Sequence, residues 1–200
     1  MSVSLRCYST SLGCPKNRVD TERLLGSLGV ALVPVELPDE AELVFINTCA
    51  FIQPATEESV RTIAQAIADI EELPKRPLLA VAGCLVGRYH AEDLAPELPE
   101  VDLWLDNSDL EAWPAMLARK LGLPEPTVPG RILSTGPSYA WLKISDGCRH
   151  ACSFCAIPNI RGGHRSHCKD MIVREARALL EQGVKELNLV AQDLTEWGCD

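Results

Sequence analysis

Leu43-Val44-Phe45-Ile46-Asn47-Thr48-Cys49 is the stretch of sequence that decides the fold. Residues 43–46 form a continuous apolar run of strand length, and such a run suits a strand that is covered on both faces. Residues 78–82, Leu-Leu-Ala-Val-Ala, form a second run of the same kind. Two buried strands of this type predict a parallel sheet with helices on both sides.

The segments around these two runs alternate between strand-like and helix-like patterns, as in a parallel α/β layer. Residues 6–9 and 101–105 are further candidate strands. Apolar residues at near-helical spacing before Gly29 predict one helix, and a second helix follows Pro54. The expected buried stripe of the second helix consists of Val60, Ile63, Ala64, Ile67 and Ile70.

A segment rich in chain breakers separates this α/β pattern from the rest of the chain. Its density of proline and glycine fits no regular element. We therefore predict a first domain over residues 1–122, a linker over residues 123–137 and a second domain over residues 138–200. The breakers are Pro124, Pro126, Pro129, Gly130, Gly136 and Pro137.

The second domain has the pattern of a single βαβ unit. Residues 140–144 are the first expected strand, residues 172–181 the helix and residues 187–191 the second strand. One such unit cannot bury both faces of its sheet. We therefore expect residues 138–200 to be the beginning of a larger barrel, truncated at Asp200.

The composition is that of an ordinary globular protein, with 46% hydrophobic and 24% charged residues among 200. No apolar run approaches the ~18 residues of a membrane span, and the N-terminus lacks a signal-peptide layout. We expect a cytoplasmic protein without a membrane partner. The formal net charge of -9 argues against direct nucleic-acid binding by this segment and favours a basic protein partner.

The nine cysteines are odd in number and occur without a secretory signal, which predicts metal or redox chemistry rather than disulfides. The sharpest pattern is Cys148-x-x-x-Cys152-x-x-Cys155, here called the loop cysteines. Three thiolates on one short loop can hold three irons of an iron-sulfur cubane and leave the fourth open to a substrate or cofactor. A structural zinc site is the alternative, and it needs four closed ligands. Candidates for the fourth ligand are His150, His164 and Cys168.

Cys14, Cys49 and Cys84, here called the strand-end cysteines, each follow a candidate strand. Ligand sites of open parallel sheets lie outside the carboxyl ends of the strands, so the sheet would bring these thiolates to one edge. This predicts a second three-cysteine cluster. The alternative is that each is a small buried apolar residue, a frequent fate of free cysteine. The cysteines expected to have no role in a cluster are Cys7, Cys168 and Cys199.

Several short motifs occur in order along nearly the whole chain. They are Ser-Leu-Gly-Cys-Pro-Lys-Asn at 11–17, Asn-Thr-Cys at 47–49, Ala-Gly-Cys at 82–84, Ile-Ser-Asp-Gly-Cys at 144–148, Ile157-Pro158 and Arg161-Gly162. Together with the loop cysteines, this order resembles the radical S-adenosylmethionine (SAM) methylthiotransferase family. Within it, Pro15-Lys16 and Val-Ala-Gln-Asp at 190–193 are similar to the branch that modifies the twelfth small-subunit ribosomal protein. The branch that modifies transfer RNA typically has Gln-Met in place of Pro15-Lys16.

The resemblance implies a flavodoxin-like α/β methylthiotransferase domain followed by the start of a radical SAM partial (β/α) barrel. It implies two 4Fe-4S clusters with SAM as the second cofactor. The loop cysteines would hold the cluster that cleaves SAM to a 5'-deoxyadenosyl radical. The strand-end cysteines would hold an auxiliary cluster that carries the sulfur to be methylated and inserted. Phe154 and Gln192 match positions near the bound SAM.

The implied reaction is methylthiolation of an aspartate β-carbon in the ribosomal protein, with an electron-donor protein as a further partner. Two other functions stay open: methylthiolation of a transfer-RNA adenosine, and a noncatalytic zinc or iron-sulfur module. Ordinary packing is the alternative role for Phe154, and a solvent-facing turn amide is the alternative for Gln192. The chain departs from the family at residues 165–168, where Arg-Ser-His-Cys replaces the usual Arg-Ser-Arg-Pro. This departure puts local anion contacts in question.

Overall fold

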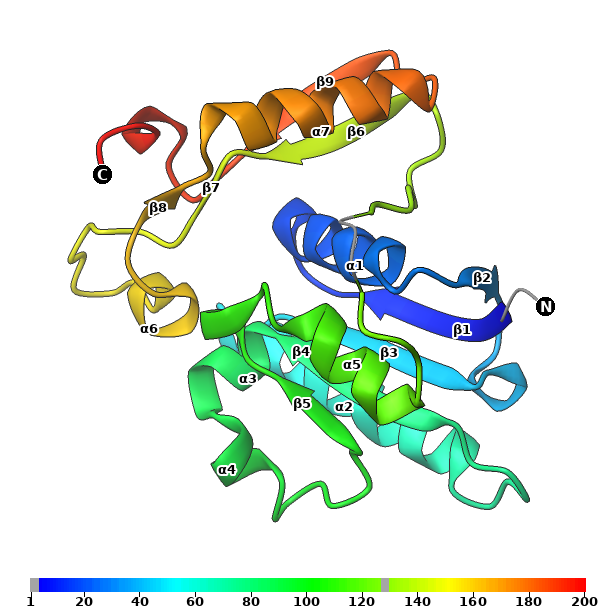
Figure 1. Ribbon diagram of the computed structural model, residues 1–200. Coiled ribbons are helices and arrows are strands. Elements are labelled where there is room, and N and C mark those ends of the chain that lie inside the picture. Colours follow the sequence, from blue (N-terminus) through cyan, green and yellow to red (C-terminus); the bar gives the residue numbers. More distant parts are fainter. Residues whose placement is uncertain (1–3, 127–129) are drawn as a thin grey trace.

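The computed structural model describes residues 4–126 and 130–200, so residues 127–129 of the predicted linker lie outside the described residues. Its main feature is a five-stranded sheet of order β2-β1-β3-β4-β5 in which all neighbouring strands are parallel (Figure 1). This is the flavodoxin-like strand order. It confirms the parallel α/β fold predicted from the buried runs. The strands are β1 (Ser4–Ser11), β2 (Ala31–Pro34), β3 (Leu43–Thr48), β4 (Leu78–Gly83) and β5 (Leu103–Leu105).

The central position of β3 follows from its sequence. Every residue of β3 is buried, because the strand pairs with β1 and β4 and is covered on both faces. In contrast, β2 is short, largely exposed and ends in Pro34, as suits an edge strand. This strand was not assigned from the sequence, although residues 30–33 are apolar, and Pro34 breaks the run after four residues.

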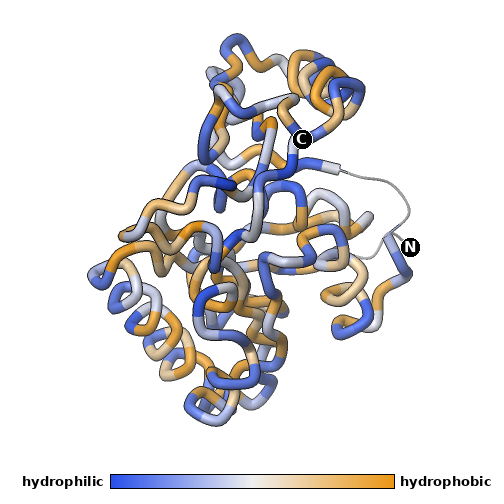
Figure 2. The backbone as a smooth tube through the Cα atoms, turned by 90° about the vertical axis from the view of Figure 1, so that its left-hand side faces the viewer, coloured by the Kyte–Doolittle hydropathy of each residue, from blue (hydrophilic) through white to orange (hydrophobic). Residues whose placement is uncertain are grey.

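Helices cover both faces of the sheet, and each carries hydrophobic and hydrophilic residues along its length (Figure 2). One apolar cluster joins α1 and α5 to one face, and another joins α2 and α3 to the other face. The long helix after Pro54 is confirmed, and 3-10 turns η1 (Pro38–Glu40) and η2 (Asn107–Asp109) lie in the connections. The helices are α1 (Pro15–Ser27), α2 (Gln53–Ile70), α3 (Cys84–Tyr89), α4 (Ala91–Leu94) and α5 (Trp113–Leu121).

The buried face of α2 differs from the predicted stripe. Val60 is 42% exposed and Ala64 is exposed, so both were wrongly assigned to this face. Polar residues take the place of Val60 in the first turns, since Thr56 and Ser59 are buried with their hydroxyls hydrogen-bonded to backbone carbonyls. A hydroxyl that is hydrogen-bonded can be buried at little cost in free energy. A search for apolar residues at helical spacing does not find such positions. The buried residues are Thr56, Ser59, Ile63, Ala66 and Ile70.

The second part of the chain contains the predicted βαβ unit. Strands β6 and β9 pair in parallel, and α7 packs on one face through an apolar cluster that includes Leu142 and Leu179. In Figure 1 this unit lies above α1, and the cysteine loop and α6 descend from it towards α3. The described part of residues 123–137, which connects the two units, has no helix or strand. The elements are β6 (Tyr139–Lys143), β7 (Ser145–Asp146), α6 (Ile157–Arg161), β8 (Arg165–Ser166), α7 (Lys169–Glu181), β9 (Glu186–Val190) and η3 (Leu194–Glu196).

None of the helices in the described ranges combines the length and the apolar composition needed to cross a membrane.

Candidate functional site

The strand-end cysteines meet at the carboxyl edge of the five-stranded sheet. Cys14 follows β1 and precedes α1, Cys49 follows β3, and Cys84 follows β4 as the first residue of α3. Strands β1, β3 and β4 are neighbours in the sheet, so their carboxyl ends lie side by side. The edge position expected from the sequence is therefore what the structure shows.

Asn17 links two of these thiols. Its Oδ1 lies 4.0 Å from the Cys14 sulfur and 3.8 Å from the Cys84 sulfur, and both thiols donate to it. Its Nδ2 donates to the carbonyls of Leu12 (2.9 Å) and Thr48 (2.7 Å), which fixes the amide between the ends of β1 and β3. The fully buried Asn17 side chain therefore holds the thiols of Cys14 and Cys84 relative to the ends of β1 and β3. Sequence reasoning quoted Asn17 in a motif without giving it this role.

The backbone of Cys49 is held by one side chain from α2. The Cys49 N–H donates to the Ser59 hydroxyl over 3.0 Å, and that hydroxyl donates back to the Cys49 carbonyl over 2.7 Å. Gly13 lies against the same cysteine with a φ of +84°, and a Cβ there would lie 2.8 Å from the Cys49 sulfur. Only glycine fits this position, because both the backbone conformation and the space exclude a side chain.

Cys84 is the most deeply buried member of the triplet, at 5% exposure. Burial raises the pKa of its thiol, and the guanidinium of Arg161 opposes this rise. The Asn107 amide donates to its sulfur over 3.8 Å, and the Oδ1 of Asn107 is buried without a protein partner.

In contrast, Cys7 lies inside β1, where burial alone raises its pKa to about 12. A thiol in that setting is a packing residue rather than a ligand.

The loop cysteines lie between β7 and α6, in the segment Gly147–Ala156 of the second unit. The loop closes on itself, since the Cys148 N–H donates to the Gly162 carbonyl over 3.2 Å and the Cys155 N–H donates to the Cys152 carbonyl over 3.1 Å. Cys152 is exposed, whereas Cys148 and Cys155 are half-buried. All nine cysteines fall within the described ranges and are free thiols.

The two residues expected near a cofactor differ in their surroundings. Phe154, within the cysteine loop, is 90% exposed. Gln192, just after β9, is half-buried, and both its Nε2 and its Oε1 are shielded from solvent without a hydrogen-bond partner in the structure. A buried amide with no partner is costly and calls for a ligand or water. Nearby, the Lys16 ammonium from the first unit donates to the Ala191 carbonyl over 3.3 Å.

The histidines considered as zinc ligands pair with carboxylates. His150 Nε2 lies 3.1 Å from Asp193, and His164 Nε2 lies 3.6 Å from Asp200. Within the described residues, the metal-ligand search finds one set of three donor atoms within 4.8 Å of one another, and it contains no cysteine: His150, Asp193 and Glu196. Among the described residues, neither cysteine triplet is part of the set that this search finds.

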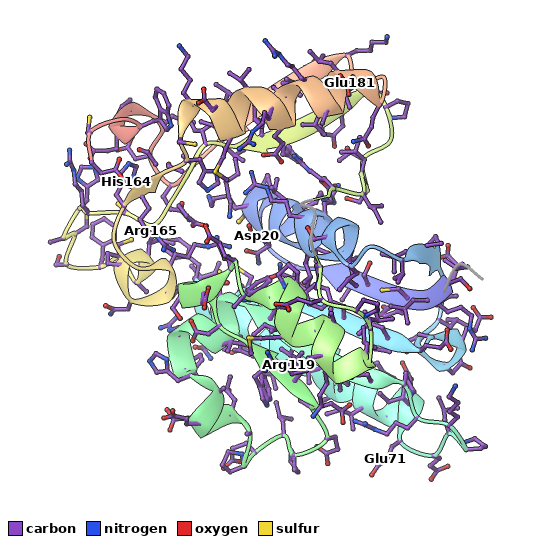
Figure 3. The ribbon with its side chains drawn as sticks, viewed as in Figure 1. Asp20, Glu71, Arg119, His164, Arg165 and Glu181 are labelled. Carbon is purple, nitrogen blue, oxygen red and sulfur yellow. The ribbon has the colours of Figure 1, made fainter. Side chains whose placement is uncertain are left out.

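A buried group of four charges joins the two units beside the strand-end cysteines. The Lys143 ammonium contacts Asp20 and lies 2.7 Å from Asp146, and the Arg161 guanidinium lies 3.2 Å from Asp20 and 3.0 Å from Asp146. Figure 3 labels Asp20 on α1, on the side that faces the second unit. Burial tends to raise the pKa of Asp146, but Lys143 and Arg161 outweigh it and hold this pKa well below the usual range.

These features define a class of α/β protein with two cysteine triplets, one at the carboxyl edge of a parallel sheet and one on a loop packed beside it. The chain belongs to the family described as Uncharacterized protein family UPF0004, whose model matches residues 6–106. The matched region contains all three strand-end cysteines.

Two curated relatives of the chain are both named Ribosomal protein uS12 methylthiotransferase RimO. The chain is 70% identical over 193 residues to the protein of that name from Nitratidesulfovibrio vulgaris, covering 96% of this chain and 45% of the relative. It is 58% identical over 200 residues to that of Lawsonia intracellularis, covering 100% of this chain and 46% of the relative. The chain thus spans a little under half the length of these relatives.

Two solved structures share the fold. They are of the radical S-adenosylmethionine methyltransferase TsrM from Kitasatospora setae, one with tryptophan substrate and a SAM analogue bound and the other with cobalamin and a [4Fe-4S] cluster bound. The first matches with a TM-score of 0.61 at 13% identity, covering 95% of this chain and 48% of that one. The second matches with a TM-score of 0.60 at 13% identity, covering 96% and 49%. This likeness concerns the fold alone.

Proposed function

We propose that the protein containing this chain is a radical SAM methylthiotransferase that modifies an aspartate β-carbon of ribosomal protein uS12. The observation that carries the proposal is the assembly of Cys14, Cys49 and Cys84 at the carboxyl ends of three adjacent strands, beside a loop with a second cysteine triplet. A noncatalytic module with one zinc ion would leave one of the two triplets without a role. The names of the curated relatives support the same reaction.

The residues of both triplets fit iron-sulfur clusters. Each triplet offers three free thiols, and three thiolates leave one iron of a cubane available. In this proposal the loop cysteines hold the cluster that binds SAM, and the strand-end cysteines hold the auxiliary cluster. When bound, the two clusters supply the electron that cleaves SAM and the sulfur that is transferred.

The chain's own residues would position these groups. The unpartnered amide of Gln192 can donate to and accept from a bound SAM, which would satisfy both of its buried atoms. Phe154 extends from the cysteine loop with most of its ring exposed, and SAM or a further segment of protein would cover it. Lys16, two residues after Cys14, donates to the Ala191 carbonyl just after β9 and so ties the strand-end site to the segment that carries Gln192. Such ties matter because a substrate radical must form within reach of the sulfur donor.

The charge of the chain supports a protein substrate. A net charge of -9 would attract a basic ribosomal protein and repel the phosphates of transfer RNA, with an effect that weakens as salt rises. An electron-donor protein is also required, because each turnover that cleaves SAM consumes an electron. A cytoplasmic location follows from a ribosomal substrate.

The test is a direct comparison of substrates with the complete protein after anaerobic reconstitution. Iron and labile sulfide are first measured, and two clusters per chain are expected. The enzyme is then incubated with SAM, a reductant and either uS12 or unmodified transfer RNA, and mass spectrometry detects the added methylthio group. Modification of uS12 alone supports the proposal. Modification of the RNA alone would assign the transfer-RNA reaction, and stoichiometric zinc without sulfide would refute the enzyme.

A further inference from the structure

Arg161 belongs to the second unit, but its side chain contacts residues of the first unit. It is the last residue of α6, directly after the cysteine loop. Its side chain is 1% exposed and reaches α1 at Asn17 and Asp20, more than 140 residues earlier in the chain. The adjacent Ile160 carbonyl packs so closely on Gly87 of α3 that a Cβ at Gly87 would lie 2.3 Å from it. The end of α6 is thus tightly packed against the helix that begins at Cys84.

The guanidinium reaches two of the strand-end cysteines through one shared atom. Its NH2 group donates to Asn17 Oδ1 over 2.5 Å, and the same Oδ1 accepts from the thiols of Cys14 and Cys84. Its NH1 group donates to Asp20 over 3.2 Å and to Asp146 over 3.0 Å. Because a guanidinium presents several donors in a rigid fork, it can make these contacts together, and the ammonium of lysine cannot reproduce them.

We propose that Arg161 is a positioning residue that locks the cysteine loop onto the strand-end site and adjusts the charge beside any group bound there. The locking part rests on the contacts alone, whereas the charge part rests on the proposed function. The buried group contains two cations, Lys143 and Arg161, and two carboxylates, Asp20 and Asp146, so it is neutral as a whole. Without the guanidinium it carries one net negative charge, which disfavours an added electron nearby.

The competing explanation is a purely structural ion pair between the two units, and Arg131 supplies a matched control. Its side chain is 5% exposed and lies 2.7 Å from Glu22 on α1 and 2.8 Å from Glu175 on α7. It therefore also ties the units together, through the buried carboxylate of Glu22 and the half-buried carboxylate of Glu175. Its hydrogen bonds within the described residues involve neither a cysteine nor Asn17.

The experiment compares R161M, R161K and R131M in the complete protein. In the metal-free protein, hydrogen–deuterium exchange is measured by mass spectrometry over residues 147–162. R161M should exchange there at least about tenfold faster than the parent, and R161K should also exchange faster, because the fork is lost. R131M should leave this segment unchanged. Equal protection in R161M and the parent would overturn the locking role.

The charge part is measured as a reduction potential in a background where all three loop cysteines are replaced by alanine, so that one cluster is left. R161M should shift the potential of that cluster to a lower value, R161K should restore most of the shift, and R131M should have no effect. Identical potentials for R161M and R131M would overturn the charge role. If no iron binds in this background, the cluster assignment itself fails, and the exchange data still decide the locking role. If R161M does not fold, R161K decides the locking role by its exchange.

Discussion

Replacing Gly13 by alanine is the sharpest test of how the sheet edge positions Cys49. Gly13 has a φ of +84°, and a Cβ there would lie 2.6 Å from the Cys49 Cβ and 2.8 Å from its sulfur. The positive φ alone costs an L-residue roughly 1–2 kcal/mol. Crowding of a packed site adds about 1–3 kcal/mol. We therefore expect Gly13→Ala to lower the free energy of unfolding by about 2–5 kcal/mol.

Gly29→Ala separates the two contributions. Gly29 also has a positive φ, +68°, but a Cβ there would meet nothing within 4 Å. This variant should therefore lose only the roughly 1–2 kcal/mol that comes from the backbone conformation. Urea denaturation of the metal-free protein measures both values under the same conditions.

Iron binding provides the second assay of the same pair. Relief of the Gly13→Ala clash requires Cys49 to move, so this variant should retain less iron at the strand-end cysteines than the parent does. Gly29→Ala should retain the parental amount. Equal destabilisation and equal iron content in the two variants would refute the reasoning, because the contact between residue 13 and Cys49 would then contribute nothing to stability.

Three further predictions concern the cysteine triplets and one buried carboxylate. Replacing any one of the loop cysteines by alanine should abolish formation of 5'-deoxyadenosine in the reconstituted enzyme, because a cubane on two thiolates is labile; a wild-type rate in Cys152→Ala would contradict this role. Replacing all three strand-end cysteines should leave one cluster and SAM cleavage but eliminate the methylthio product, whereas two remaining clusters would point to other ligands. Burial acts to raise the pKa of Glu175, but hydrogen bonds and charge from Arg23 and Arg131 lower it overall. Its stabilising contribution is therefore complete above the pKa of an unfolded glutamate, about 4.3, and is lost as the pH falls below it. Glu175→Gln should flatten the loss of unfolding free energy below about pH 5, and the exposed Glu181→Gln should not.

The elements that could be predicted from the sequence are those whose position is determined by a short stretch of residues. Continuous apolar runs identified β3 and β4, because strands buried on both faces leave no room for polar residues. The rule for strand ends then placed all three strand-end cysteines at one edge. The stripe of α2 was misassigned because buried hydroxyls replace apolar residues where the helix meets Cys49.

The remainder of the site depends on contacts that no local pattern encodes. Arg161 reaches Asn17 across 144 positions of sequence, and Lys143 reaches Asp20 across 123. Each of these residues is charged or polar and lies in a helix or, for Lys143, at the end of strand β6, and exposure is the default expectation for such side chains. Their burial arises only when the two units pack together. Arg161-Gly162 was noted in a motif, but its sequence neighbours give no indication of its partners.

The hydrogen bonds that hold the strand-end loops bear on how the protein would withstand oxygen. The backbone of Cys49 is held by Ser59, and the loop ends are bridged by the Asn17 amide, so the framework does not depend on the thiols. Zinc fingers behave oppositely, since they unfold when the metal leaves. If the strand-end cysteines hold a cluster as proposed, its loss to oxidation would leave the sheet edge folded with three thiols in place. Such damage would be repairable, because iron and sulfide could be reinstalled without refolding the chain.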